Sequence, residues 1–375
     1  MPVGRKRIGE AGGLVALGLV CVTLASAAPS PAPLPRLTLW QQLQHRCRYL
    51  ARDRLTAYPW PVKPFHREHP VRGNFGDPRT VFEGPGEGAF SFHNGIDISA
   101  WPGNRVYPVR TGFVVRVTGD LVSVESPGGR RFQYIHLRPE VRVGEEVMGS
   151  KSVLGTVRPR WNHIHLTELR GDCAVNPLMP HHLEPYRDTT KPTIRAILFE
   201  SRSSQPLRPD ALAGKIRIVA DAFDTPELRS PYPWNRLPVA PNHVSWRLTT
   251  FGGRVVAKNT AVDFRYGEPP RQAFCTVYAP GTEQNFAAVD GTYNYGKAGR
   301  YLFDLTPNLI DLSRLPPGRY RVEVTASDVG GNAATRSVVV HILPGKGGHG
   351  PETVDTRCSG QNGASTLADS SAVAH

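Results

Sequence analysis

The stretch VYPVRTGFVVRVTGDLVSVESPGGRRFQYIHL, residues 106–137, decides the fold class. β-Branched and aromatic residues concentrate in three runs of the kind that form strands: 106–117, 121–125 and 131–137. Gly119-Asp120 separates the first two runs, and Ser126-Pro127-Gly128-Gly129, a turn-forming sequence, separates the last two. Strands joined by such short turns pair antiparallel. The stretch therefore predicts an antiparallel β domain with almost no helix.

Two histidine motifs lie on either side of this stretch, His93-Asn-Gly-Ile-Asp97 and His163-Ile-His165. Zinc accepts His nitrogen and Asp oxygen, and a catalytic zinc site uses three protein ligands and leaves a fourth position to water. Side chains two apart on a strand lie on the same face, so both histidines of the second motif would enter one cleft. Three of the four side chains could hold zinc, with the fourth beside a bound water, where a general base is needed. The pattern predicts a hydrolase site.

Length and composition set the background. The chain has 375 residues, which is long enough for two domains, and its 35 Pro and 37 Gly favour short strands and many turns. A formal net charge of +13 favours contact with nucleic acid, anionic lipid or an acidic cell-wall polymer, and it is equally compatible with a solvated surface. No RNA- or DNA-binding motif accompanies the charge, so we expect no nucleic-acid partner.

The first 27 residues have the pattern of a secretory signal peptide. Arg5-Lys6-Arg7 is a positive start, 14–24 is an apolar run, and Ala25-Ser26-Ala27 is a cleavage sequence. The apolar run is too short for a good transmembrane span. We therefore expect an exported protein without a transmembrane span, located in the periplasm, the cell envelope or the medium.

Export changes how the cysteines are interpreted. Four cysteines follow the signal peptide: Cys47, Cys173, Cys275 and Cys358. In an oxidising compartment they could form disulfides, and four cysteines allow three pairings. A Cys47–Cys173 bond is the first pairing to test, because it would tie the N-terminal segment to the end of the central β domain. The sequence leaves the pairing open.

The rest of the chain divides into three parts. Residues 28–57 combine an Ala/Pro/Ser-rich lead-in with an amphipathic helix over 37–55. Residues 188–344 are again β-rich, and Leu315-Pro-Pro-Gly-Arg-Tyr320 is a turn followed by a strand with Tyr at its start, as in a tyrosine corner. This part resembles immunoglobulin-like or fibronectin type III-like β-sandwiches. Residues 345–375 are Gly/Ser/Ala-rich and predicted to be disordered.

A third element, Tyr134-Ile-His136-Leu137, lies between the two histidine motifs. The order H-x-x-x-D, Y-x-H-L and H-x-H resembles the lysostaphin-like family of peptidoglycan zinc metalloendopeptidases. Asn74-Phe-Gly-Asp-Pro-Arg79 also resembles the segment that leads to the first motif of that family. The resemblance covers about residues 58–180 and implies a zinc metallopeptidase domain over 58–187.

The resemblance implies a role for each of five residues. It makes His93, Asp97 and His165 the ligands of one zinc ion per chain, and His136 and His163 the two catalytic histidines. One of these histidines would take a proton from water and the other would bind the developing oxyanion. Which one is the base cannot be assigned from the sequence.

Other polar residues near the motifs receive less specific interpretations. Glu168 stands one position later than the glutamate that follows H-x-H in the family, so we expect its side chain on the other face of the strand. Arg79 could orient a substrate carboxylate or form a structural salt bridge. Four histidines lie in no predicted strand and have no partner residue in the motifs, so they are interpreted as surface residues: His66, His69, His181 and His182.

The sequence thus predicts a mainly β, exported zinc endopeptidase that cuts cross-links or stem peptides of bacterial peptidoglycan. The alternative is a cell-wall binding or regulatory protein that keeps the peptidase fold and lacks catalysis. A further hypothesis gives the C-terminal sandwich contact with a wall polymer or a protein partner.

Overall fold

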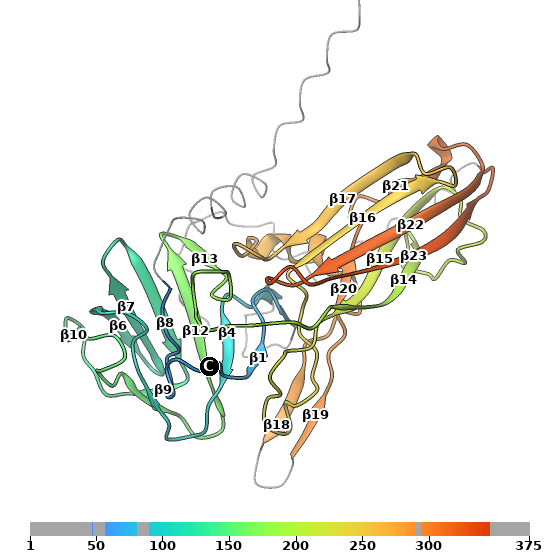
Figure 1. Ribbon diagram of the computed structural model, residues 1–375. Helices are drawn as coiled ribbons and strands as arrows, with labels where there is room; N and C mark the ends of the chain where they lie inside the picture. Colours follow the sequence, from blue (N-terminus) through green and yellow to red (C-terminus); the bar gives the residue numbers. More distant parts are fainter. Residues whose placement is uncertain (1–46, 48–56, 81–89, 290–293, 346–375) are drawn as a thin grey trace, which may run out of the picture. The chain divides into compact units, whose positions relative to one another are not determined.

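The computed structural model describes residues 47, 57–80, 90–289 and 294–345. Within this part of the chain the structure is mainly β and the strands of every sheet pair antiparallel, which confirms the predicted fold class (Figure 1). The expected signal peptide and lead-in lie outside the described residues, as does the expected disordered tail apart from its first residue. Of the expected helix over 37–55, only Cys47 is described, and it is helical.

The first part of the chain forms an eight-stranded sheet (Figure 1). Seven of its strands lie in the order β1 (Val71–Gly73), β4 (Ile96–Ser99), β12 (His163–Arg170), β8 (Arg130–Ile135), β7 (Leu121–Ser126), β6 (Gly112–Thr118) and β10 (Glu146–Val147). The eighth strand, β13 (Cys173–Val175), pairs with β12. The strand β12 therefore lies between β4 and β8, and it carries the H-x-H motif at its start.

The predicted run 106–117 is two strands rather than one. It divides into β5 (Arg105–Val106) and β6, because Pro108 has no backbone N–H to donate to a sheet ladder. The strand β5 belongs to a small sheet of the order β5, β11 (Gly155–Val157) and β9 (Leu137–Pro139). The two-stranded pair β2 (Pro78–Arg79) and β3 (Ser91–Phe92) leads to the first histidine motif.

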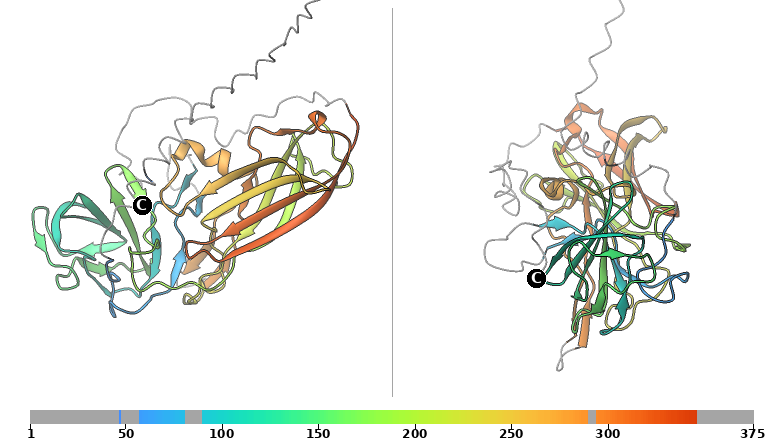
Figure 2. Two further views of the ribbon diagram at one scale, coloured as in Figure 1. Left: turned by 45° about the horizontal axis from the view of Figure 1, so that its top comes forward. Right: turned by 90° about the vertical axis from the view of Figure 1, so that its left-hand side faces the viewer.

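The second part of the chain is a β-sandwich of two four-stranded sheets, seen one behind the other in Figure 2. One sheet contains β14 (Thr193–Ser201), β15 (Lys215–Phe223), β20 (Leu302–Asp304) and β21 (Ile310–Asp311). The other contains β17 (Val255–Asp263), β16 (His243–Thr250), β22 (Gly318–Ser327) and β23 (Ala333–Ile342). The hydroxyl of Tyr320 donates to the carbonyl oxygen of Pro316 at 2.8 Å, which confirms the predicted tyrosine corner.

Residues 264–301, between β17 and β20, depart from a plain sandwich. They contain the 3-10 turn η1 (Arg271–Ala273), the short helix α2 (Phe274–Val277) and the hairpin β18 (Phe286–Val289) and β19 (Asn294–Lys297). The ring of Phe92, in β3, lies 5.4 Å from that of Phe274 and 5.9 Å from that of Tyr278. This segment therefore packs aromatic side chains against the first part of the chain.

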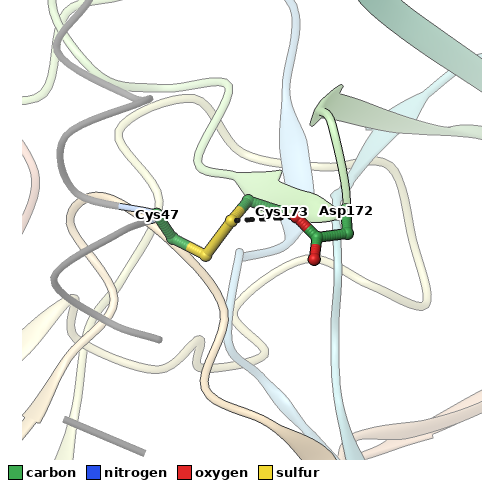
Figure 3. The surroundings of a disulfide bond; sticks show 3 residues. All are labelled: Cys47, Asp172 and Cys173. Carbon is green, nitrogen blue, oxygen red and sulfur yellow. Dashed lines mark hydrogen bonds between the residues drawn. A yellow bond between two sulfur atoms is a disulfide. The ribbon is translucent and has the colours of Figure 1, made fainter. Parts of the chain in front are cut away.

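A disulfide joins Cys47 to Cys173 on β13 (Figure 3). This is the pairing that the sequence singled out for testing, and it is confirmed. Cys275 is also disulfide-bonded. A search of the described helices finds none that is both long and apolar enough to cross a membrane.

Candidate metal centre

The pairing of three strands brings the two histidine motifs together. His165 on β12 lies opposite Asp97 on β4, and its other neighbour is Ile135 at the end of β8. His163 lies opposite Ser99. Because side chains alternate along a strand, His163 and His165 share one face of β12. The sheet thus gathers residues from three distant segments at one edge of its face.

Three ligand atoms converge at the candidate metal centre, defined by His93, Asp97 and His165. Nε2 of His93 lies 2.8 Å from Nδ1 of His165 and 3.1 Å from Oδ1 of Asp97, and Nδ1 of His165 lies 3.2 Å from the same oxygen. Ligand atoms held about 2.0–2.1 Å from one zinc at tetrahedral angles lie roughly 3.3 Å apart. The side chains therefore fit a single zinc ion with little movement.

The contacts of His93 and His165 indicate which ring nitrogen of each faces the centre. Nδ1 of His93 lies 2.8 Å from the carbonyl oxygen of Asn74, which accepts only from a protonated nitrogen. Nε2 of His165 lies 2.7 Å from the hydroxyl of Thr167, whose own hydrogen is directed to Asn94. Both protons therefore point away from the centre. Two bare nitrogens and a carboxylate oxygen face one another, an arrangement that a cation stabilises.

Two glycines allow this close approach. A Cβ on Gly95 would lie 2.4 Å from the carbonyl oxygen of Leu166 and 2.7 Å from Nε2 of His165. A Cβ on Gly73 would overlap the carboxylate of Asp97 at 2.4 Å. Only a residue without a side chain fits at either position, so Gly95 of the H-x-x-x-D motif is needed for the geometry of the centre.

Electrostatics favour the unprotonated forms of His93 and Asp97. Burial lowers the pKa of His93 to about 4. Burial alone raises the pKa of Asp97, but attraction to His93 and His163 outweighs it and holds that pKa well below its usual value. Nη2 of Arg79 lies 3.1 Å from Oδ2 of Asp97. Of the two interpretations that the sequence left open for Arg79, this ion pair corresponds to the structural salt bridge.

His136 lies beside the centre with its own set of contacts. Its φ of 72° takes the chain out of β8 and turns the ring toward His163, with ring centroids 4.5 Å apart. Its Nδ1 lies 3.2 Å from Oδ2 of Asp120, and its ring stacks on Trp161 at 3.8 Å. Burial lowers the pKa of His136, and the hydrogen bond to Asp120 opposes that shift. A neutral imidazole is thus held by a carboxylate on one side.

His163 faces a cation. Its Nε2 lies 3.4 Å from Oδ1 of Asp97, while its Nδ1 is in contact with both the carbonyl oxygen of Trp161 and the guanidinium of Arg72. The carbonyl requires a proton on Nδ1 and the guanidinium requires a lone pair there, so only one of these bonds forms at a time. Burial and the charge of Arg72 lower the pKa of His163 to about 3. The ring stays neutral in either tautomer.

The opposite face of β12 carries a buried polar cluster. Glu168 lies on that face, as its position along the strand predicts, and it accepts hydrogen bonds from the hydroxyl of Tyr58 and from Nδ1 of His182 at 2.7 Å. Nε of Arg130 lies 3.1 Å from the same carboxylate. The prediction that His182 is a surface residue is wrong, because its side chain is buried by this long-range contact with Glu168.

The other three histidines that were predicted to be surface residues differ in their exposure. His66 and His181 are exposed, as predicted. His69 is half-buried, because its ring packs on Trp60 at 5.4 Å, so its interpretation as a surface residue is only partly right. The sequence assigned no individual role to Asn74, which lies in the segment before the first motif, and it did not single out Arg72, Asp120, Trp161 or Thr167. The H-x-H motif itself gave a signal for Thr167, since residues 163, 165 and 167 share one face of a strand.

Comparison with solved structures finds proteins similar to about a third of this chain. A structure of the SpoIIQ–SpoIIIAH pore-forming complex matches 35% of this chain and 94% of its own, with 21% identity and a TM-score of 0.28. The catalytic domain of a mutant of the prophage-encoded M23 protein EnpA from Enterococcus faecalis matches 30% and 88%, with 20% identity and a TM-score of 0.23. Pseudoalterin, an M23 metalloprotease from the deep sea, matches 36% and 81%, with 14% identity and a TM-score of 0.25. No family model and no curated protein matches the chain.

Proposed function

We propose that this protein is an exported endopeptidase that binds one zinc ion per chain and hydrolyses peptide bonds in bacterial peptidoglycan. The observation that carries the proposal is the convergence of His93 Nε2, His165 Nδ1 and Asp97 Oδ1, with the other ring nitrogens in contact with the Asn74 carbonyl and the Thr167 hydroxyl. Such a donor set serves no evident structural purpose without a cation. The peptidoglycan substrate is proposed from the family resemblance of the three motifs.

Zinc bound at this centre would supply a Lewis acid and a water of lowered pKa. In this proposal the catalytic histidines are His136 and His163, and His136 is the general base. Its Nδ1 proton is held by Asp120, so its Nε2 has a free lone pair to accept a proton from water. The carboxylate of Asp120 then stabilises the imidazolium that forms. The proton would pass from Nε2 to the leaving amine.

His163 takes the second role in this scheme. The guanidinium of Arg72 beside its Nδ1 opposes a positive charge on the ring, so His163 is a poor base. With Nδ1 accepting from Arg72, its Nε2 carries a hydrogen that can be donated to an oxyanion near Asp97. The difference in charged neighbours, a carboxylate for one histidine and a guanidinium for the other, supports this division of labour.

The remaining features of the chain agree with export. A disulfide such as Cys47–Cys173 persists in oxidising compartments and is rare in the cytosol. In the proposal, residues 1–27 direct export to the periplasm, the cell envelope or the medium. Residues 58–187 form the peptidase domain, and 188–344 form the immunoglobulin-like sandwich.

The test is incubation of zinc-loaded wild-type protein with purified peptidoglycan, followed by mass spectrometry of the soluble fragments. We expect fragments with new peptide ends, their loss with a chelator, and their loss in a His136→Ala variant that retains zinc. His181→Ala, at an exposed histidine, is the matched control and should leave the fragments unchanged. Sedimentation of the protein with peptidoglycan and no release of fragments would instead support the binding-protein alternative.

A further inference from the structure

A pocket of about 260 Å³ is lined in part by Arg72, whose guanidinium contacts His163. Both parts of the chain line it: Arg72 and Trp101 come from the first part, and Tyr232 and Trp234 come from the loop between β15 and β16. Trp101 and Tyr232 are each 59% exposed. The pocket thus has aromatic side chains at its accessible surface and a cation deeper in its wall.

Arg72 is the buried group of this pocket and is only 7% exposed. Its guanidinium lies 3.9 Å from the centre of the Trp234 ring, and its Nη2 contacts Nδ1 of His163. Its Nε and Nη1 are buried and have no hydrogen-bond partner among the described residues. A buried guanidinium with unused donors is costly, and a planar carboxylate that accepts two of its N–H groups would relieve that cost.

The charge of the described residues that line the pocket is one-sided. Lys63 and Arg72 are cations, Asn162 adds a polar side chain, and no Asp or Glu is among these residues. Arg72 forms no ion pair with a carboxylate in the part of the chain that the structure describes. Asp97 attracts Arg72 from outside this lining, and two cations with no carboxylate among the lining residues favour an anionic ligand.

We propose that this pocket is a substrate subsite that binds a carboxylate of the peptide being cleaved, with Arg72 as the principal partner and Lys63 as the second. This inference rests on the proposed function, since the contact of Arg72 with His163 would place the carboxylate close to the reacting bond. It also gives the second part of the chain a role in selecting the substrate. Tyr232 and Trp234 form one wall of the subsite, and Trp234 holds the guanidinium plane by stacking.

The test is calorimetric binding of a synthetic peptidoglycan stem tetrapeptide to the full zinc-loaded chain carrying His136→Ala, which we expect to bind without turnover. The peptide is used in three forms: with free carboxylates, amidated at its terminal carboxylate, and amidated at its internal glutamate carboxylate. We expect one amidation to raise the Kd by about tenfold or more and the other to have little effect, which identifies the carboxylate bound.

Adding Arg72→Gln to the His136→Ala chain should abolish the difference in Kd between free and amidated peptide. Adding Lys63→Gln, at an exposed position, should reduce that difference. Lys258→Gln, at an exposed lysine on β17, is the control and should leave the difference intact. Equal affinity for all three forms, or no binding of any, would overturn the subsite. Absence of hydrolysis by the wild type with a retained carboxylate preference would overturn the proposed function alone.

Discussion

Thr167 determines which ring nitrogen of His165 is available to bind a metal. Its hydroxyl oxygen lies 2.7 Å from Nε2, and a proton held on Nε2 by this contact leaves the lone pair of Nδ1 directed at His93 and Asp97. Replacing Thr167 with Val keeps the shape and removes the acceptor, so we expect zinc affinity to fall about 10- to 100-fold. Competition with a chromogenic chelator would measure the affinity.

Two further variants serve as controls for this measurement of zinc affinity. His165→Ala should lose zinc altogether, because it removes a ligand, whereas Thr335→Val, on the exposed face of β23, should bind zinc as the wild type does. Near-stoichiometric zinc in a folded His165→Ala protein would contradict the ligand assignment.

Asp120 should control the acidic limit of activity. Its hydrogen bond to Nδ1 raises the pKa of His136, against the burial that lowers it. A base acts only when unprotonated, so hydrolysis is lost as the pH falls through this pKa. Asp120→Asn removes the stabilising charge and lowers the pKa further. We therefore expect a lower kcat, by about 10- to 100-fold, and an acidic limb of the kcat/KM profile shifted to lower pH.

The pH profile of kcat/KM for peptide hydrolysis measures this effect. Asp210→Asn, in an exposed pair with Arg208, serves as the control because it also removes one carboxylate. An unshifted acidic limb in Asp120→Asn would show that His136 does not titrate in that limb.

The sequence predicted the three motif residues that converge, because each motif is local and a strand fixes side-chain direction. Asp120 and Arg72 could not be found in the same way. Asp120 lies in a turn between β6 and β7 and reaches His136 only because β8 leaves the sheet at that residue. Arg72 reaches His163 across β4, so its contact depends on the order of strands in the sheet.

At the scale of the element, the two faces of β12 carry different groups: the histidines of the candidate site on one, and a buried ion pair on the other. One face carries His163 and His165, and the other carries Glu168, which is fully buried with Arg130. Removing one partner of a buried ion pair leaves an uncompensated charge. We expect Glu168→Gln to lower the free energy of unfolding by roughly 3–5 kcal/mol, because Arg130 loses its counter-charge.

Urea-induced unfolding of both forms would measure the change in the free energy of unfolding. Glu125→Gln on the neighbouring strand β7 breaks an exposed ion pair with Arg131 and should cost less than about 1 kcal/mol. Equal losses in the two variants would mean that Glu168 and Arg130 do not depend on each other.

Strand identity was largely readable from the sequence, whereas connections were not. The runs around β7, β8, β16 and β22 predicted strands because β-branched residues alternate or cluster between turn residues. The segment 264–301 gave no such pattern. Its aromatic residues are buried by contact with Phe92 from a distant part of the chain, and such contacts leave no local period in the sequence.

At the scale of the whole molecule, Asp77 links the two parts of the chain. It accepts from the backbone N–H of Asn74 at 2.8 Å and from that of Ala240 at 2.7 Å. Burial raises the pKa of Asp77 to about 7. The unfolded chain loses this proton near pH 4 and the folded chain keeps it to about 7, so folding is progressively disfavoured across that window. The slope reaches up to about 1.4 kcal/mol per pH unit.

Asp77→Asn should remove this contribution. The free energy of unfolding of the variant, relative to the wild type, should therefore increase between pH 5 and pH 7, as measured by urea unfolding at both values. The comparison cancels other carboxyl groups of raised pKa, such as Glu268, which are common to both proteins. A difference that stays constant with pH would contradict a raised pKa at Asp77.

The two parts of the chain also share one hydrophobic core, which includes Phe75, Phe92, Phe264 and Tyr278. A chain ending at residue 187 would expose the apolar surface around Phe92, and we expect it to bind 8-anilinonaphthalene-1-sulfonate strongly and to unfold at a lower temperature than the full chain. Fluorescence of the dye and calorimetry would measure these effects. A truncated chain that unfolds cooperatively at the temperature of the full protein would show that the first part is independent.

The Cys47–Cys173 bond closes a loop over a sequence separation of 126 residues. A single cut by a protease anywhere between these two cysteines would leave both pieces joined as one covalent molecule, and the noncovalent contacts of the sheet would hold them in register. In the proposed function the protein is exported, and it would then share its surroundings with hydrolases. The bond therefore allows a nicked chain to survive intact where a chain without it would come apart.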